Sequence, residues 1–141
     1  MYYLIDLGHT FGRRGDLMGQ KFYICKHCGN IVAIIRNVGV PIYCCGEKMH
    51  EIVPNSTEAS GEKHVPVYEV NGNIVHVTVG AVEHPMTEEH YIEWICLETE
   101  QGIQYAHLNP NDEPRAKFAL CDGDKIEAAH AFCNKHSLWR N

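Results

Sequence analysis

The order of hydrophobic and polar positions predicts short β-strands over the C-terminal two thirds of the chain. Residues 65–70 and 74–79 are rich in β-branched residues. They flank Asn71-Gly72-Asn73, a turn sequence that favours a β-hairpin. Residues 91–97 alternate apolar and polar side chains between two faces, as a half-buried strand does.

Three later segments complete this pattern. Strands are predicted at 103–108, 115–120 and 126–132. The last segment is ambiguous because Glu127-Ala128-Ala129 favours helix, but it is short and follows the turn Asp122-Gly123-Asp124. About seven short strands separated by regular turns indicate an all-β fold with an immunoglobulin-like β-sandwich.

The N-terminal third has a different pattern, built around closely spaced cysteines. Residues 21–32 contain two short β-rich segments joined by Cys25-Lys26-His27-Cys28. Gly29 follows the second cysteine, where such a turn often needs a positive φ. The adjacent pair Cys44-Cys45 occupies a second turn.

A polar run from Glu47 to Gly61 indicates a linker between a small domain and a larger one. We therefore predict an extension of unknown role at 1–20, a small metal domain at 21–57 and the β-sandwich at 58–141. A domain of roughly 40 residues is too small to be stable through its own core, so a bound metal is expected there.

Composition narrows the classes of function. The net charge is −6, from 12 basic and 18 acidic residues without a basic run, which argues against nucleic acid as a partner. No apolar run approaches the roughly 20 residues that cross a bilayer. Residues 2–5 are apolar and precede Arg13-Arg14, the reverse of the order in a secretory signal. These features predict a cytoplasmic protein with no membrane partner.

Seven cysteines and ten histidines are a high content of metal-binding side chains. An odd number of cysteines in a chain without an export signal argues against a disulfide scaffold. Cys25, Cys28, Cys44 and Cys45 match a tetrahedral four-sulfur site for zinc or iron. A structural zinc ribbon is the alternative, but zinc ribbons usually separate their second pair by two residues, so the adjacent pair favours iron.

A second set of candidate ligands centres on Cys133-Asn134-Lys135-His136, where a thiol and an imidazole can close on one ion. Two ligands do not make a site, and the segment from Glu62 to His90 offers three more. These are His64, His84 and His90. Our hypothesis is a mononuclear site with four imidazoles and one thiolate.

Together these motifs resemble the desulfoferrodoxins, the two-iron-centre superoxide reductases, over residues 21–141. The motifs are Cys25-x-x-Cys28, Cys44-Cys45, Glu62-Lys63-His64-Val65-Pro66, His84-Pro85-Met86, His90-Tyr91-Ile92-Glu93-Trp94 and Cys133-Asn134-x-His136-x-Leu138-Trp139. The chain departs from the pattern in residues 1–20 and at Ser137, where glycine is common.

The resemblance implies a role for each candidate. Cys25, Cys28, Cys44 and Cys45 would hold a rubredoxin-like iron, for which zinc can substitute. His64, His84, His90 and His136 would surround a second iron in a plane, with Cys133 as its axial thiolate and the opposite position open in the ferrous state. Lys63 would attract the anionic substrate, and Glu62 would ligate the ferric iron after turnover.

The implied activity is one-electron reduction of superoxide to hydrogen peroxide, with electrons from rubredoxin or a similar donor and with a homodimer as the assembly. An axial thiolate donates electron density to the opposite position, which suits this chemistry. The alternatives are a non-enzymatic electron carrier that uses the four-cysteine iron, and a zinc-containing binding module without redox chemistry.

Other soft or aromatic residues receive no role in this hypothesis. Cys96 and Cys121 are expected to be small buried or incidental thiols, and Trp94 and Trp139 to lie in the core or in the walls of a site. The remaining histidines are expected at the surface: His9, His27, His50, His76, His107 and His130.

Overall fold

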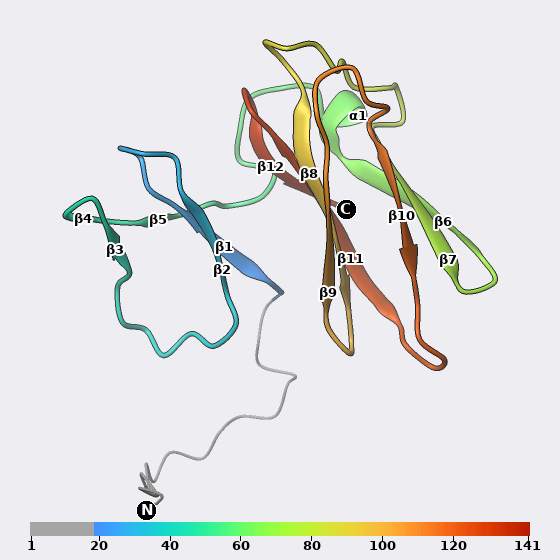
Figure 1. Ribbon diagram of the computed structural model, residues 1–141, viewed down its shortest axis with the longest axis horizontal. Coiled ribbons are helices and arrows are strands. Elements are labelled where there is room, and N and C mark those ends of the chain that lie inside the picture. The colour runs from blue at the N-terminus through green and yellow to red at the C-terminus, as the bar shows by residue number, and fades with distance from the viewer. Residues whose placement is uncertain (1–18) are drawn as a thin grey trace, which may run out of the picture.

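The computed structural model describes residues 19–141, which form two β-structured parts (Figure 1). The N-terminal part contains β1 (Lys21–Ile24), β2 (Ile31–Ile34), β3 (Tyr43–Cys44), β4 (Glu47–Lys48) and β5 (His50–Glu51). The C-terminal part contains α1 (Gly61–His64), β6 (Pro66–Asn71), β7 (Ile74–Val79), β8 (Ile92–Thr99), β9 (Ile103–His107), β10 (Arg115–Ala119), β11 (Ile126–Cys133) and β12 (Ser137–Arg140). No helix in this described part is long and apolar enough to cross a membrane. Of the predicted extension, residues 1–18 lie outside the described residues.

In the N-terminal part, β1 lies between β2 and β5 in an antiparallel sheet, and β3 pairs with β4. Ile24 is opposite Ile31, so the Cys-x-x-Cys turn closes the β1–β2 hairpin, as predicted. The interpretation of 47–61 as a linker is wrong for residues 47–51, because these contain β4 and β5. Such short, exposed strands bury too little apolar surface to produce an alternating pattern in the sequence.

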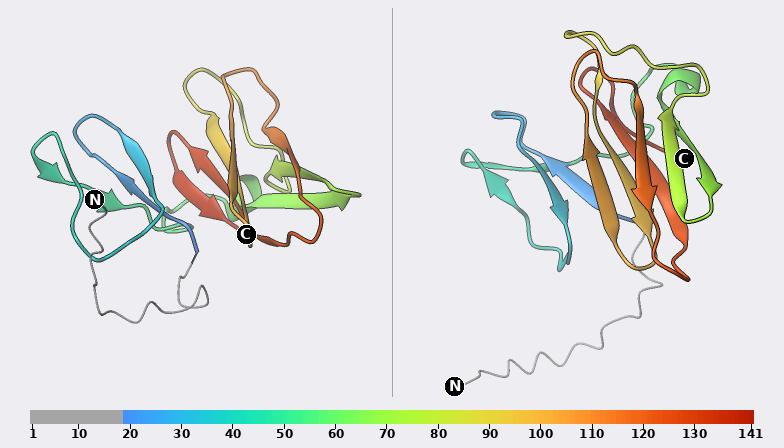
Figure 2. Two further views of the ribbon diagram at one scale, coloured as in Figure 1. Left: turned by 60° about the horizontal axis from the view of Figure 1, so that its bottom comes forward. Right: turned by 45° about the vertical axis from the view of Figure 1, so that its right-hand side comes forward.

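The C-terminal part is a β-sandwich of two antiparallel sheets (Figure 2). One sheet has the order β10-β7-β6 and the other β12-β11-β8-β9. β7 buries Val75, Val77 and Val79 between the sheets and exposes His76. Each fully buried valine contributes about 1.5–3 kcal/mol relative to an exposed one, so this alternation fixes which face of β7 points inward.

The sandwich confirms the predicted all-β class. The β6–β7 hairpin turns at Gly72, which has a φ of +62°, and residues 126–132 form a strand rather than a helix. β12 was not predicted as a separate strand. It pairs with β11 from Cys133↔Ser137 to His130↔Arg140, directly after the Cys133–His136 motif.

The two parts share a hydrophobic core. Phe22 and Ile52 from the N-terminal part pack with Trp94 and Phe132 from the sandwich. The Phe22 and Trp94 rings are 5.1 Å apart, and the Trp94 and Phe132 rings are stacked at 5.4 Å. This contact covers the outer face of β8 and β11, which explains why both strands are buried along most of their length.

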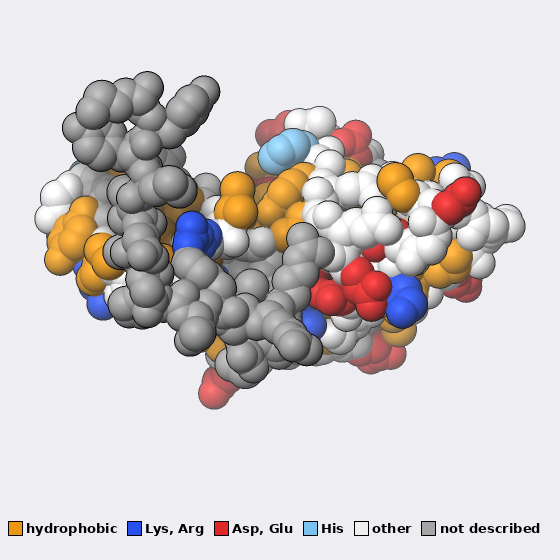
Figure 3. All heavy atoms as spheres, turned by 90° about the horizontal axis from the view of Figure 1, so that it is seen from below, with side chains coloured by type: hydrophobic (Ala, Val, Ile, Leu, Met, Phe, Trp, Pro, Cys, Tyr) orange, Lys and Arg blue, Asp and Glu red, His pale blue; other side chains and the backbone are white. Residues whose placement is uncertain are grey.

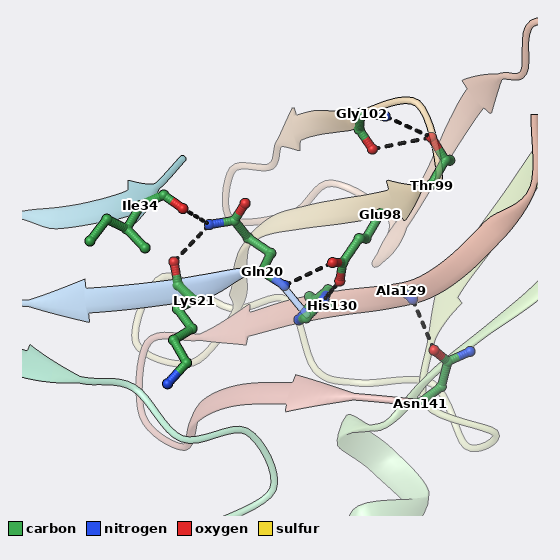
Figure 4. Close-up of polar contacts among 9 residues, drawn as sticks. All are labelled: Gln20, Lys21, Ile34, Glu98, Thr99, Gly102, Ala129, His130 and Asn141. Carbon is green, nitrogen blue, oxygen red and sulfur yellow. Dashed lines mark hydrogen bonds and ion pairs between the residues drawn. The ribbon is translucent and has the colours of Figure 1, made fainter. Parts of the chain in front are cut away.

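A buried hydrogen bond between a histidine and a carboxylate lies at the same junction (Figure 4). His130 Nε2 donates to Glu98 Oε2 at 3.0 Å, and the Gln20 backbone N–H donates to Glu98 Oε1 at 2.8 Å. The expectation that His130 is a surface residue is therefore wrong: its side chain is fully buried, with its ring 5.6 Å from that of Phe22. The hydrogen bond from His130 holds the pKa of Glu98 below its usual value.

Apolar side chains are also exposed on the N-terminal part. Figure 3 shows hydrophobic side chains gathered at the end of the molecule that this part forms. Four of its large hydrophobic residues are highly exposed: Ile35 (96%), Val38 (70%), Val40 (68%) and Tyr43 (66%). We refer to these four as the apolar patch.

Candidate metal centres

Four cysteine sulfurs converge in the N-terminal part. Cys25 and Cys28 come from the turn after β1, Cys44 ends β3, and Cys45 begins the turn between β3 and β4. The four sulfur atoms all lie within 4.8 Å of one another, and those of Cys28 and Cys44 are 3.6 Å apart. Four sulfurs at about 2.3 Å from a tetrahedral ion are roughly 3.8 Å from each other, so this set needs only a small adjustment to bind one ion.

The two turns have backbone conformations that let closely spaced cysteines face one ion. The Cys25 backbone N–H donates to the Asn30 carbonyl oxygen at 2.9 Å, and the Gly29 N–H donates to that of Cys25 at 2.9 Å. Gly29 has a φ of +82°, as its position in the sequence predicted. Cys45 and Gly46 are both left-handed, with φ of +53° and +75°, so the chain reverses at once after the adjacent cysteines.

The protonation of these sulfurs fits a cation site. None of the cysteines in the described residues forms a disulfide. The backbone N–H of Cys28 lowers the pKa of Cys25 to about 7. Hydrogen bonding with Cys28 raises the pKa of Cys45 to about 12, because crowded sulfurs resist a second negative charge. A metal ion supplies the positive charge that lets all four ionise, and a donor set made only of sulfur selects iron or zinc.

A second convergence lies at one end of the sandwich. His64 ends α1, His84 and His90 come from the loop between β7 and β8, Cys133 ends β11, and His136 comes from the turn before β12. Four of these side chains each offer one donor atom, and the four atoms lie within 4.8 Å of one another: His64, His84, His90 and Cys133. His136 Nδ1 lies 3.0 Å from His64 Nε2 and 3.8 Å from Cys133 Sγ. The structure thus brings together all five side chains that the sequence proposed for this site.

Backbone carbonyls orient two of the imidazoles. His64 Nδ1 donates to the Ser60 carbonyl oxygen at 2.7 Å, and His84 Nδ1 donates to that of Pro85 at 2.6 Å. Each bond places the ring proton on Nδ1, so Nε2 keeps its lone pair: that of His84 has no hydrogen-bond partner, and that of His64 faces His136 Nδ1 at 3.0 Å. Nothing in the sequence marks Ser60 or Pro85 for this task, because any residue supplies a carbonyl.

The unpaired nitrogen atoms are the clearest structural sign of a metal site. Nε2 of His84 and Nε2 of His90 are buried without a hydrogen-bond partner. A buried polar atom left unsatisfied costs about 1–3 kcal/mol, and a bound cation would remove that cost. Burial lowers the pKa of His84 to about 4 and also lowers the pKa of His64 and His90, so the rings are neutral, as metal ligands must be.

Cys133 lies at the inner side of this cluster and is fully buried. Burial raises the pKa of its thiol, while hydrogen bonds from the backbone N–H groups of Lys135 and His136 act in the opposite direction. These donors are in place to stabilise a thiolate once a cation is present.

The site is bounded by Trp139 of β12 and by a close backbone contact between Gly80 and α1. Trp139 stacks on His64 with ring centroids 4.8 Å apart, and its Nε1–H donates to the His136 carbonyl oxygen at 3.0 Å. The expectation that tryptophan lines a core or a site wall is confirmed here. Gly80 lies so close to α1 that a Cβ atom on it would be 2.6 Å from the Lys63 carbonyl oxygen.

The two residues with proposed reaction roles lie beside the ligands. Glu62 and Lys63 are exposed on the single turn of α1, directly before the buried His64. The charge of Lys63 contributes to the lowered pKa of His64, after the larger effect of burial. Ser137 has a φ of +64°, which explains why glycine suits this position better than serine.

Comparison with known proteins places this chain in a family. The family model described as Desulfoferrodoxin matches residues 56–141. The chain is 43% identical over 120 residues to a desulfoferrodoxin of Clostridium acetobutylicum, covering 85% of this chain and 94% of that protein. It is 39% identical over 103 residues to a superoxide reductase of Thermococcus kodakarensis, covering 61% of this chain and 90% of that protein. Among solved structures, the superoxide reductase from Treponema pallidum superposes with a TM-score of 0.75 at 36% identity, covering 87% of this chain and 98% of that one.

Proposed function

The chain belongs to the desulfoferrodoxin family, and from this premise we propose how its two centres act together as a superoxide reductase. The reaction is O₂⁻ + e⁻ + 2 H⁺ → H₂O₂. The observation that supports it most directly is the convergence of four imidazoles and one thiol, two of whose ring nitrogens are buried and unpaired. That geometry argues against an electron carrier in which the histidines are incidental.

His64, His84, His90, His136 and Cys133 would hold the metal of this site. Three neutral imidazoles, a fourth from the Cys133–His136 turn and a thiolate form a mixed nitrogen and sulfur set that suits iron. When bound, ferrous iron supplies the single electron that reduces superoxide. The carbonyls that hold the ring protons of His64 and His84 keep this ligand set in one orientation.

Lys63 attracts the substrate. Its ammonium group is exposed next to a buried ligand in a chain whose net charge is −6, so it raises the local concentration of a small anion against an unfavourable overall field. Glu62, its neighbour in α1, supplies a carboxylate to the oxidised site. Both protons of the product come from water, because the α1 turn is open to solvent.

Replacing Lys63 by glutamine removes one positive charge and leaves the fold intact, since the side chain is exposed. We expect the second-order rate with superoxide to fall several-fold and its dependence on ionic strength to become flatter. The matched control is Lys117→Gln, an exposed lysine on β10. Equal rates for Lys63→Gln and the control at low salt would contradict the attracting role.

Cys25, Cys28, Cys44 and Cys45 would hold a second iron, and this centre would accept electrons from rubredoxin or a similar donor. Cys28 and Cys45 are exposed, so this centre lies at the surface where a small donor protein can approach. Zinc can occupy the same four sulfurs, and it would keep the structure but abolish any electron transfer through this part.

The domain division that supports this function is a small metal domain at 21–57 and a catalytic sandwich at 58–141, with 1–20 as an extension.

We further propose that the protein is a homodimer and that the apolar patch is buried between subunits. Ile35 and Val38 are the most exposed large hydrophobic side chains of the described residues, and an interface there would remove their apolar surface from water. Ile35→Glu should therefore shift the mass measured by light scattering from dimer to monomer. A cytoplasmic location and the absence of nucleic-acid partners stay predictions from the sequence.

The test of the activity is a single mixing experiment. Reduced protein is exposed to superoxide generated by pulse radiolysis, and hydrogen peroxide and dioxygen are both measured. We expect one peroxide per superoxide consumed and no release of dioxygen. Dioxygen formed in a one-to-one ratio with peroxide would indicate dismutation instead, and no reaction would reject the enzyme assignment.

A further inference from the structure

His90 stands in the loop between β7 and β8, two residues before β8 begins, and no backbone carbonyl of the described residues orients its ring as those of Ser60 and Pro85 orient His64 and His84. The loop makes its own turn contacts: the Thr87 backbone N–H donates to the His90 carbonyl oxygen at 3.0 Å, and the His90 N–H donates back to that of Thr87 at 3.2 Å. These bonds shape the loop but do not determine where it lies relative to Cys133. A ligand in such a loop needs a contact that reaches across to the other ligands.

Asn134 makes that contact through three hydrogen bonds. Its backbone N–H donates to the Tyr91 carbonyl oxygen at 3.1 Å. Its side-chain Oδ1 accepts from the Tyr91 backbone N–H at 3.0 Å, and its Nδ2 donates to the Glu89 carbonyl oxygen at 3.1 Å. The three bonds thus bracket His90 on both sides, and they start from the residue that directly follows Cys133.

The strand pairing explains why a side chain is needed here. β8 and β11 pair regularly from Ala128↔Glu98 to Phe132↔Trp94, but the next pair is Cys133↔Ile92, with an irregularity at Glu93. After this shift the backbone of the Cys133–His136 turn leaves the sheet and has no further strand to pair with. The Asn134 amide has both a donor and an acceptor, so it replaces the missing backbone partner of the 89–91 segment.

We infer that Asn134 is a positioning residue that holds His90 at a set distance from Cys133 and His136, and thereby prepares the metal site before the ion binds. This inference rests on the proposed function, because it takes these side chains as the ligands. It assigns to Asn134 no contact with substrate or metal. Residues that orient metal ligands in this way commonly change metal affinity by about 10–100-fold when they are replaced.

The chain offers a matched control at the other end of β12. Asn55 Nδ2 donates to the Arg140 carbonyl oxygen at 2.9 Å, and Asn55 Oδ1 accepts from the Arg140 backbone N–H at 2.8 Å. Asn55 thus makes the same pair of side-chain bonds to backbone, but to a residue that is not a ligand. Asn55 has a φ of +58°, so glycine is the replacement that removes the amide without backbone strain.

The experiment compares Asn134→Ala, Asn134→Asp and Asn55→Gly with the unaltered iron-loaded protein. Each protein is reduced, incubated with a ferrous chelator, and then reoxidised. The iron remaining at the histidine site is read from its thiolate-to-iron absorption band. The separate absorption of the four-cysteine iron serves as an internal control. Melting temperatures of the metal-free proteins show how much general stability each change removes.

We expect Asn134→Ala to weaken iron retention at the histidine site about 10–100-fold, with no change at the four-cysteine iron. Asn134→Asp keeps the oxygen that accepts from Tyr91, so it should retain iron better than alanine does. Asn55→Gly should lower the melting temperature by a similar amount without weakening iron retention. In the metal-free proteins, amide exchange at Tyr91 should be faster in Asn134→Ala alone.

Two results would overturn the inference. One is iron retention by Asn134→Ala equal to that of the unaltered protein. The other is an equal loss of iron in Asn55→Gly, which would make the effect one of general stability. If Asn134→Ala does not fold, Asn134→Asp decides by the same criteria. Absence of the thiolate-to-iron band in the unaltered protein would instead reject the proposed function, and this inference with it.

Discussion

Replacing Gly80 by alanine should separate two of the histidine ligands, because Gly80 sits where the β7–β8 loop crosses α1. Its backbone N–H donates to the Val65 carbonyl oxygen at 3.2 Å, and the Val82 N–H donates to that of Glu62 at 3.2 Å. A Cβ atom at Gly80 would lie 2.6 Å from the Lys63 carbonyl oxygen and closer still to that of Val82. Both obstacles are backbone atoms, so no side-chain rotation can make room.

The cost has two parts that the structure allows us to separate. Gly80 has a φ of +84°, and a residue with a Cβ loses about 1–2 kcal/mol in that region. The steric overlap adds about 1–3 kcal/mol, as overpacking does elsewhere. Gly72 has a φ of +62° with nothing within 4 Å of its Cβ position, so Gly72→Ala carries the first part alone.

The assay is urea unfolding of the metal-free proteins, with tryptophan fluorescence as the signal that reports the folded fraction. With a urea dependence of about 2 kcal/mol per molar, Gly72→Ala should lower the midpoint by roughly 0.5–1 M and Gly80→Ala by roughly 1–2.5 M. Because His64 and His84 have ring centroids 4.6 Å apart across this contact, Gly80→Ala should also weaken iron binding, and Gly72→Ala should not. Equal midpoints for the two variants would refute the close contact between α1 and the loop.

Three further changes test the junction and the last turn. The hydrogen bond from His130 holds the pKa of Glu98 below its usual value, so the carboxylate stabilises the fold above the pKa of an unfolded glutamate, and this gain is lost as pH falls through the lower pKa of the folded protein. Glu98→Gln should therefore show a shallower loss of stability than the unaltered protein in acid unfolding between roughly pH 5 and 3. Phe22 is 1% exposed in the shared core, so Phe22→Ala should cost about 3–5 kcal/mol and broaden or split the thermal transition; an unchanged calorimetric trace would mean the two parts do not depend on each other. Ser137→Gly should stabilise the protein by about 1 kcal/mol by relieving the φ of +64°, and a lower urea midpoint would show that serine makes a compensating contact.

The strands and the candidate ligands were predictable because their signals are local. Alternation along β7 identifies its buried face, and Asn71-Gly72-Asn73 identifies the hairpin, from neighbouring residues alone. The spacing of Cys25 and Cys28 likewise describes one turn. The short polar strands β4 and β5 carried no such signal, so 47–51 was assigned to a linker.

His130 shows where local reasoning fails. Nothing near it in sequence distinguishes it from His76, since both stand within β-strands. His130 is buried because Phe22 from the N-terminal part covers its face of the sheet, and it pairs with Glu98, which is 32 residues away. A histidine of one strand and a carboxylate of another meet only after the sheet has formed.

The sequence by itself determined which atoms could bind metal: the sulfurs, the imidazoles and the order in which they occur along the chain. Only the tertiary structure decided how they are presented. The carbonyls of Ser60 and Pro85 set the ring protons, Gly80 lets α1 approach the loop, and Asn134 links that loop to Cys133. These contacts use backbone groups that every residue possesses, so their partners are specified by three-dimensional position and not by residue type.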